Sequence, residues 1–445
     1  MKEIQKIPVF DKFIYINPTI GCFSFAKSSG QMQGYIDYEE VMNQFKPKFI
    51  NICLCICNNC NLNCDYCFNE KKNQKIMTSD QADKIIDEMI NRFPDCDKYY
   101  VDLSGNGEPL LNLKCILEIN SFCKERSNLI RKEILVSFVS NGVLLTNKMA
   151  ELLQKEGILF GISLDGNKHN HDLHRKTING SPTYDLIMKN IKSIKFRDYI
   201  GCAITITNDV FNLVETIDDL SKYFNTISIK PVRDAELGLT RKSVNKWLNQ
   251  YELLTLKIIN DSKSGNWDTL KILINGDDYF GKFIYRAFLE SRTLNRCDSR
   301  ISRFCFDCYG HIYGCAPATK YNQLSIEKMD YQKAFRKQIE NTKASCNNCL
   351  FYLFCGGECE IETIINKKIN SDMCLFKQGL IKFAMYIKLF IEGNDIYLFN
   401  DIKNFCTEKA NRFSKDEELY SFLNSHQDLN FTDGKNEYDQ LNKKY

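Results

Sequence analysis

Short apolar runs alternate with longer amphipathic stretches between residues 48 and 235. Apolar runs at 49–56, 99–103, 133–139, 158–164, 200–206 and 226–230 predict six buried strands. Between them, apolar residues recur at helical spacing over 78–92, 112–124, 146–156, 183–196 and 209–223, which predicts five helices. Strands that alternate with helices of this length form βαβ units, so we expect an α/β domain built on a parallel sheet over residues 48–235.

The pattern changes on both sides of this domain. Residues 1–47 are a separate N-terminal segment, with short strands predicted at 13–16 and 22–25 and a short helix at 38–45. Residues 236–296 are interpreted as linking helices, including a long helix over 240–263. Residues 297–380 are rich in Cys and mostly lack periodicity until a helical stripe begins at 376 and runs to 392. Residues 381–445 are expected to form C-terminal helices and a polar tail.

The composition is that of a soluble globular protein with two or three structural units: 445 residues, 44% hydrophobic and 26% charged. The net charge of +3 lacks the excess of Lys and Arg that nucleic-acid binding requires. No apolar stretch is long enough for a membrane span, and the N-terminus shows no secretion signal. We therefore expect a cytoplasmic protein that binds neither nucleic acid nor membrane.

Cysteine is strongly over-represented, with 21 residues against five His. A disulfide framework is typical of short exported chains, whereas this chain is long, carries an odd number of Cys and has no visible export signal. Metal ligation inside the cell is the better interpretation, and iron–sulfur clusters are the sites that use the most thiolates.

A first group of cysteines, Cys60-x3-Cys64-x2-Cys67, follows the strand predicted at 49–56. Three thiolates on one loop can hold three irons of a cubane and leave the fourth iron open to a substrate or cofactor. The loop follows the carboxyl end of a parallel strand, where α/β sites are built. The alternatives are a zinc knuckle or buried free thiols, but zinc prefers four ligands and no His lies near in sequence.

This spacing resembles the signature of radical S-adenosylmethionine (SAM) enzymes. The resemblance covers residues 48 to about 235 and implies a partial (β/α)6 barrel. In that family the open iron chelates the amino and carboxylate groups of SAM. Reductive cleavage then yields a 5′-deoxyadenosyl radical that abstracts hydrogen.

The resemblance also implies a set of SAM contacts at the ends of the strands. The segment 104–109 is similar to the family's glycine-rich motif, and the ends of the third and fourth predicted strands lie where relatives bind the ribose or carboxylate of SAM. Arg175 ends a His-Asp-x-x-Arg stretch whose guanidinium suits a carboxylate. The expected contacts are Gly105, Asn106, Gly107, Glu108, Ser140, Asn141, Ser163, Asp165 and Arg175. Ordinary turn chemistry explains the strand-end residues equally well, and a polar loop with a helix start explains the three His at 169–174 better than a metal site does. No acid–base residue is assigned.

A second group of cysteines follows the pattern Cys297-x12-Gly310-x4-Cys315, then Cys346-x2-Cys349-x5-Cys355-x3-Cys359, then Cys374. This pattern resembles the SPASM extension, which holds two auxiliary [4Fe–4S] clusters. By this resemblance the outer cluster has four ligands, Cys346, Cys349, Cys355 and Cys374, and the inner cluster has three, Cys297, Cys315 and Cys359. A fourth inner ligand is missing upstream. Either Cys305 or Cys308 replaces it, or the inner cluster has an open iron. The alternative is one zinc ion bound by the four thiolates between 346 and 359.

These resemblances imply a maturase of ribosomally made peptides that forms an oxidative thioether or C–C cross-link. Its cofactors would be SAM and three [4Fe–4S] clusters, with the auxiliary clusters accepting the electron that leaves the substrate. Its partners would be a precursor peptide with a leader, expected to contain Cys, and a one-electron reductant such as flavodoxin or ferredoxin. Residues 1–47 are a candidate for leader binding by strand addition. The alternatives are an anaerobic sulfatase-maturating enzyme that makes formylglycine, and a non-catalytic iron–sulfur electron carrier.

Overall fold

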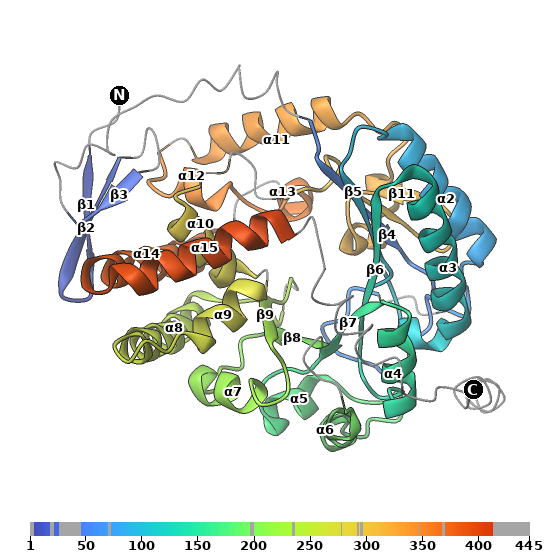
Figure 1. Cartoon of the computed structure of the whole chain (residues 1–445), viewed down its shortest axis with the longest axis horizontal. Coiled ribbons are helices and arrows are strands. Elements are labelled where there is room, and N and C mark those ends of the chain that lie inside the picture. The colour runs from blue at the N-terminus through green and yellow to red at the C-terminus, as the bar shows by residue number, and fades with distance from the viewer. Residues whose placement is uncertain are drawn as a thin grey trace.

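A computed structural model describes most of the chain and shows a curved sheet with helices outside it (Figure 1). The described residues are 4–17, 22–25, 46–69, 73–195, 200–233, 236–276, 278–291, 293, 297–346, 348–366 and 370–412. The helix predicted at 38–45 and the polar tail after 412 lie outside them.

The central sheet has eight strands in the order β11-β10-β4-β5-β6-β7-β8-β9. Six of them are the predicted strands, each confirmed to within two residues: β4 (Phe49–Leu54), β5 (Lys98–Asp102), β6 (Glu133–Ser140), β7 (Leu159–Ser163), β8 (Ile200–Ile206) and β9 (Thr226–Pro231). All six run parallel. An α/β fold of the partial-barrel kind is therefore confirmed.

The six strands predicted between residues 48 and 235 are all present, and the sheet continues beyond them into the Cys-rich region. Strand β10 (Arg303–Phe306) pairs parallel to β4, and β11 (Ile312–Tyr313) pairs antiparallel to β10 at the edge. The four residues of β10 are too few to show an alternating pattern. The boundary drawn at residue 297 therefore does not separate two sheets.

Helices cover the outer face of the sheet (Figure 1). They are α2 (Ser79–Arg92), α3 (Leu113–Ile130), α4 (Asn147–Lys155), α5 (Lys168–His174), α6 (Tyr184–Ser193) and α7 (Leu213–Leu220), with the short helix η2 (Pro109–Asn112) before α3. The side chains of Thr78, Thr146 and Asn212 cap α2, α4 and α7 by accepting a hydrogen bond from a first-turn amide. The cap at Asn212 also explains why α7 begins later than predicted.

The outer edge of β9 is covered by the turn between α9 (Asp268–Asn275) and α10 (Tyr279–Leu289). Asp278 accepts hydrogen bonds from the Ile229 amide at 2.8 Å and the Gly281 amide at 2.6 Å, so one carboxylate caps both the strand edge and α10. A Cβ at Gly276 would lie 1.9 Å from the Ile227 carbonyl oxygen, which explains the glycine at this close approach.

A helical layer and a small N-terminal sheet lie beside the barrel. Helix α8 (Arg241–Ser262) and α10 pack against α14 (Ser371–Asn394), which also contacts α15 (Ile396–Arg412). The N-terminal strands β1 (Gln5–Val9), β2 (Lys12–Asn17) and β3 (Cys22–Ser24) form an antiparallel sheet. It contacts α14 where the Phe10 ring lies 4.6 Å from that of Tyr386. Both predicted N-terminal strands are thus confirmed.

The Cys-rich region contains more helix than its sequence indicates. Its elements after β11 are η3 (Ala316–Lys320), η4 (Asn322–Leu324), α11 (Tyr331–Cys346), α12 (Tyr352–Cys355) and α13 (Glu360–Asn366).

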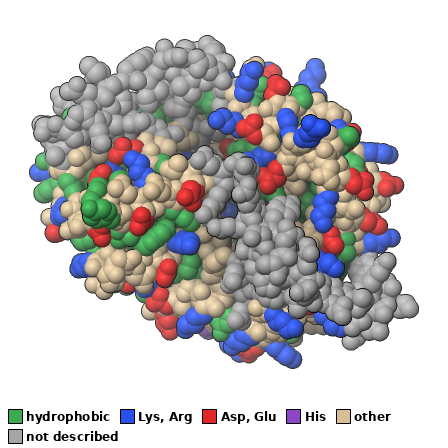
Figure 2. Space-filling view, viewed as in Figure 1, with side chains coloured by type: hydrophobic (Ala, Val, Ile, Leu, Met, Phe, Trp, Pro, Cys, Tyr) green, Lys and Arg blue, Asp and Glu red, His purple; other side chains and the backbone are tan. Residues whose placement is uncertain are grey.

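On the face seen in Figure 2, basic and acidic side chains are interspersed over α2 and α3. Among the described residues, no helix is long and apolar enough to cross a membrane.

Candidate active site and cysteine groups

The loop after β4 holds Cys60, Cys64 and Cys67 as three half-buried cysteines that are not joined in disulfides. It is tied by backbone hydrogen bonds to the end of α5 and the segment after it: the Asn63 amide donates to the Lys176 carbonyl at 2.8 Å, and the Asp65 amide donates to the His174 carbonyl at 3.3 Å. These bonds hold the loop against the end of α5.

The three thiols lie close enough to influence one another. Burial raises the pKa of Cys64 to about 11; Cys60 and Cys67 add to the shift, and the Arg175 guanidinium opposes it. A thiol with this pKa is protonated at neutral pH, so it needs a metal ion to become a thiolate. Three neighbouring thiols on a fixed loop fit the donor set of a cubane with one open iron.

The glycine-rich segment packs directly on this loop. A Cβ at Gly105 would lie 2.8 Å from the Cys55 Cα, and a Cβ at Gly107 would lie 2.3 Å from the Asn59 carbonyl oxygen. Gly107 also has φ +64, a backbone conformation that glycine adopts without strain. Both glycines are therefore required by the close approach to the β4 end and the cysteine loop, whatever ligand lies beside them.

The Glu108 carboxylate is buried and committed to the end of β6. It accepts hydrogen bonds from the Ser140 hydroxyl and the Asn141 amide, both at 2.7 Å. Burial raises the pKa of Glu108, and these donors oppose the shift. The Asn141 side chain donates to the Asn61 amide oxygen at 2.7 Å and lies 3.8 Å from the Cys60 sulfur. Among Glu108, Ser140 and Asn141, it is the Asn141 side chain that reaches the cysteine loop.

Asp165 and Arg175, predicted as separate SAM contacts, form a buried ion pair. The Arg175 Nε lies 2.6 Å from the Asp165 Oδ2, and Nη2 lies 3.3 Å from Oδ1. The Asp165 carboxylate also accepts from the Thr205 amide at 2.7 Å and from the Tyr66 hydroxyl. Tyr66 lies between Cys64 and Cys67, so this network anchors the cysteine loop to the end of β7, where half-buried Ser163 also lies. Tyr66 was not among the site residues predicted from the sequence.

Two histidines of α5, His171 and His174, hold the same network in place. The His171 Nδ1 accepts from the Asp165 amide at 3.1 Å. Its Nε2 lies 3.0 Å from the Thr183 hydroxyl, whose own proton goes to the Arg175 carbonyl, so Nε2 carries the ring proton. Burial lowers the pKa of His171 to about 4, which keeps the ring neutral. His174 contacts Asp65 of the cysteine loop at 2.9 Å.

The cysteines expected at the inner cluster gather around Arg233. The Arg233 Nη1 donates to the Cys359 sulfur at 3.1 Å, and the nearby Cys297 and Cys315 also favour the charged form of this guanidinium. Burial raises the pKa of Cys315 to about 12, and Cys297 and Cys359 both contribute to that shift. The three residues that the sequence assigns to the inner set are therefore neighbours.

The cysteines expected at the outer cluster form a second group. Burial raises the pKa of Cys346 to about 11, with contributions from Cys355 and Cys349. Cys374 joins them through its interaction with Cys355. Cys359 belongs to the Arg233 group, so a zinc site made from the four thiolates between 346 and 359 receives no support from the geometry. Among the described residues, no three metal-binding side chains converge on one ion position.

Cys305 and Cys308, the two candidates for a fourth inner ligand, differ in position. The Cys308 thiol donates to the Cys55 carbonyl at 2.6 Å, so it faces the end of β4. The Cys305 sulfur lies 3.8 Å from the Cys55 sulfur. Cys315 of the inner group is close enough to contribute to the raised pKa of Cys305. Cys305 is thus the one of the two that lies toward the inner group.

The glycine-rich segment also touches the inner group. The Asn106 side chain donates to the Thr319 hydroxyl at 3.3 Å, and Thr319 donates to the Ala316 carbonyl in η3, directly after Cys315. Residues on the two sides of the predicted domain boundary therefore meet at the site. Asn106 was expected to contact SAM, and its contact with Thr319 had no signal in the sequence.

The barrel and the three-cysteine loop match the model of a known protein family. The model of the radical SAM superfamily matches residues 54–227, which run from the end of β4 into β9 and include the three-cysteine loop. Residues 54–227 form a radical SAM domain. The family implies a [4Fe–4S] cluster and SAM, and the three thiols of the loop fit such a cluster.

Curated relatives extend the similarity beyond the radical SAM domain. The uncharacterized protein MJ0907 of Methanocaldococcus jannaschii is 30% identical over 183 residues, which are 41% of this chain and 60% of that protein. The radical SAM cyclopropyl synthase TigE of Paramaledivibacter caminithermalis is 24% identical over 76% of this chain and 73% of its own. The serine-type anaerobic sulfatase-maturating enzyme of Bacteroides thetaiotaomicron is 24% identical over 67% of this chain and 80% of its own.

Solved structures share the fold of this chain at low sequence identity. Native anSMEcpe with bound AdoMet has a TM-score of 0.61 at 18% identity and covers 80% of this chain and all of its own. Streptococcus suis SuiB bound to precursor peptide SuiA has a TM-score of 0.50 at 14% identity, over 74% of this chain and 75% of its own.

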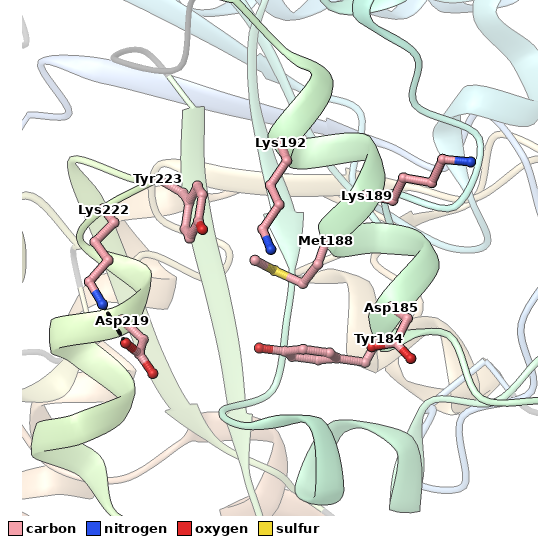
Figure 3. A pocket seen from close by; sticks show the side chains of 8 residues that line it. All are labelled: Tyr184, Asp185, Met188, Lys189, Lys192, Asp219, Lys222 and Tyr223. Atoms are coloured by element: carbon pink, nitrogen blue, oxygen red, sulfur yellow. Dashed lines mark hydrogen bonds and ion pairs between the residues drawn. The ribbon is translucent and has the colours of Figure 1, made fainter.

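A cavity of about 520 Å³ lies away from the radical SAM cysteine loop, between α6 and the end of α7 (Figure 3). Its lining is Tyr184, Asp185, Met188, Lys189, Lys192, Asp219, Lys222 and Tyr223. Lys222 is paired with Asp219 at 2.6 Å. None of the predicted site residues lines this cavity.

Proposed function

We propose that this radical SAM protein matures a ribosomally made peptide by forming an oxidative thioether or C–C cross-link. The observation that carries the proposal is the presence of two further groups of thiols, one around Arg233 and one around Cys346, in addition to the SAM-type loop. Hydrogen abstraction needs only the first cluster. Closing a cross-link also requires removal of an electron from the substrate, and two auxiliary clusters suit that task.

The cofactors in this proposal are SAM and three [4Fe–4S] clusters. When bound, SAM and the first cluster supply the 5′-deoxyadenosyl radical that abstracts hydrogen. The residues of the chain hold this site in place. Asn141 reaches the Cys60 side of the loop, the Tyr66–Asp165–Arg175 network fixes its other side, and Asn106 ties it to the inner group through Thr319.

A peptide substrate is supported by the fold shared with SuiB, whose structure contains a precursor peptide. Among the described residues, the N-terminal sheet has the order β1-β2-β3, so β1 and β3 are its edge strands, and strand addition to such an edge is a known mode of peptide binding. We place leader binding there and expect the substrate to contain Cys. A flavodoxin or ferredoxin would supply the electron that starts the reaction, and the cytoplasm would be the place where it happens.

The second candidate is formylglycine formation on a sulfatase. It is favoured by the similarity to the Bacteroides sulfatase-maturating enzyme over 80% of that protein's length. The third reading, a non-catalytic electron carrier, has no support among these relatives, since those with a described role are named as enzymes.

The test is anaerobic co-expression with the short peptide encoded nearest to the gene, followed by its intact mass. Loss of two hydrogens per cross-link, with Cys no longer reactive to alkylation, supports a thioether; loss with free thiols supports a C–C bond. An unchanged peptide, together with a sulfatase peptide that acquires a hydrazide-reactive aldehyde, would favour the second candidate.

Two Cys variants separate the roles of the clusters. Cys64→Ala should abolish SAM cleavage, whereas Cys349→Ala should preserve SAM cleavage and lose the product. SAM cleavage by Cys64→Ala would refute the assignment of the first cluster. Normal product formation by Cys349→Ala would refute the role of the outer group.

A further inference from the structure

Helix α14 carries two lysines that are equally buried, Lys377 and Lys388, each 1% exposed. They lie about three turns apart on the same helix. The Lys388 ammonium is paired with Glu290 at 2.9 Å and Glu392 at 2.8 Å. An ammonium is buried at a high cost in free energy unless it is paired, so the surroundings of each lysine indicate why it is there.

The surroundings of Lys377 are the outer cysteine group. Its Nζ donates to the Gly357 carbonyl at 3.1 Å and to the Glu358 carboxylate. Cys374 lies one turn before it on α14, and the Cys374 sulfur is 3.1 Å from the same Glu358 carboxylate. The charge of Lys377 also acts on Cys346 and Cys349. One ammonium therefore faces a carboxylate and at least three of the four thiols of this group.

This arrangement has a consequence for charge when the thiols become ligands. A cluster held by four thiolates is negatively charged, and Glu358 adds a further negative charge beside Cys374. Among the described residues, Lys377 is the buried cation that acts on this group of cysteines. The corresponding cation of the inner group, Arg233, is 41% exposed, so water weakens its effect.

We propose that Lys377 compensates the charge of the outer cysteine group and thereby sets the reduction potential of the cluster held there. The proposal rests on the outer cluster of the proposed function. Uptake of one electron lowers the charge of the cluster by one, with no bond made or broken in the protein. A fixed cation in a buried site stabilises the reduced form and is poorly screened by salt. Lys377 thus keeps the outer cluster a good acceptor for the electron that leaves the substrate.

The test is a potentiometric titration followed by electron paramagnetic resonance, with purified, iron-loaded protein. The parent protein for this test carries Ala at positions 60, 64 and 67, so it lacks the first cluster. The signal of the outer cluster is identified as the one that Cys349→Ala abolishes. Lys377→Met should lower the midpoint potential of this signal by at least 59 mV, which corresponds to a tenfold change in the equilibrium constant for one electron. Lys388→Met is the matched control, with equal burial on the same helix, and should leave the midpoint unchanged.

Two conservative variants decide the question if Lys377→Met does not fold. Lys377→Arg should keep the midpoint near that of the parent, and Glu358→Gln should raise it because a negative charge is removed. A Glu358→Gln midpoint that falls or stays unchanged would overturn the proposal. So would a Lys377→Met protein with an intact outer signal and the parent midpoint, and in that case the proposed function would stand. Absence of any Cys349-dependent signal in the parent would overturn both together.

Discussion

Asp165→Asn tests the network that fixes the cysteine loop to the barrel. The side chains of Asp165 and Arg175 are 2% and 10% exposed, and the carboxylate receives hydrogen bonds from Arg175, Thr205 and Tyr66. Asparagine keeps the shape but leaves the guanidinium buried without its counter-charge, and its amide group faces donors. Breaking one side of such a pair costs about 3–5 kcal/mol. That is a large part of a typical folding free energy of about 5–15 kcal/mol.

The assay is urea denaturation under anaerobic, reducing conditions before iron is added, followed by tryptophan fluorescence. Trp247 is fully buried and its indole donates to the Thr207 carbonyl at 2.8 Å, so its emission reports on the end of β8. The control is Asp209→Asn, because Asp209 contacts His174 from a side chain that is 48% exposed. This substitution should lower the free energy of unfolding by less than about 1 kcal/mol. The double variant Asp165→Asn/Arg175→Gln should recover part of the loss. A cost below about 1 kcal/mol for Asp165→Asn, or strictly additive losses in the double variant, would refute this reasoning.

Three further substitutions test other parts of the molecule. Gly107→Ala places a Cβ 2.3 Å from the Asn59 carbonyl oxygen, so the purified protein should lose iron from the first site; iron content equal to the parent would contradict this. Burial and neighbouring carboxylates raise the pKa of Asp83 to about 6, above the unfolded value of about 3.9, so its ionised form destabilises the fold above pH 6. Asp83→Asn should therefore stabilise the protein by about 1 kcal/mol at pH 8, allowing for partial exposure, with the gain disappearing below pH 4; a gain independent of pH would exclude this cause. Asn106→Ala removes the contact with Thr319 and should raise the ratio of SAM cleaved to product formed; an unchanged ratio would show that the contact has no role in coupling.

The parallel strands were predictable because each is an apolar run long enough to stand out. Strand β10 was missed since its only distinctive residue, Cys305, was read as a candidate metal ligand. Helix α11 was missed because it buries few apolar residues, chiefly Phe335 and Ile339, and it also buries the polar Gln338. The pattern of such a helix is too weak to distinguish it from a polar loop.

The cysteine groups were predictable because their spacing is local, whereas the contacts that hold them are not. Tyr66 and Asp165 are about a hundred residues apart, and their meeting depends on how the loop lies over the end of β7. Lys388 reads in the sequence as an interruption of an apolar helical stripe. The same holds for Lys377. The structure shows that Lys388 pairs with two glutamates away from the cysteines, whereas Lys377 pairs with Glu358 beside the outer cysteine group.

Strand β10 also limits how this protein can be recombined with its relatives. The Cys55 amide donates to the Phe306 carbonyl at 2.9 Å, and the Asn51 amide donates to the Ser302 carbonyl at 2.7 Å, so β4 depends on β10 for half of its strand pairing. A chimera joined at residue 296 would give β4 a foreign neighbouring strand next to the start of the three-cysteine loop. A junction after Tyr313 keeps β10 and β11 with their own barrel. The Cys-rich region is therefore not an interchangeable module. Its first seventeen residues, 297–313, belong structurally to the barrel and have to be exchanged together with it.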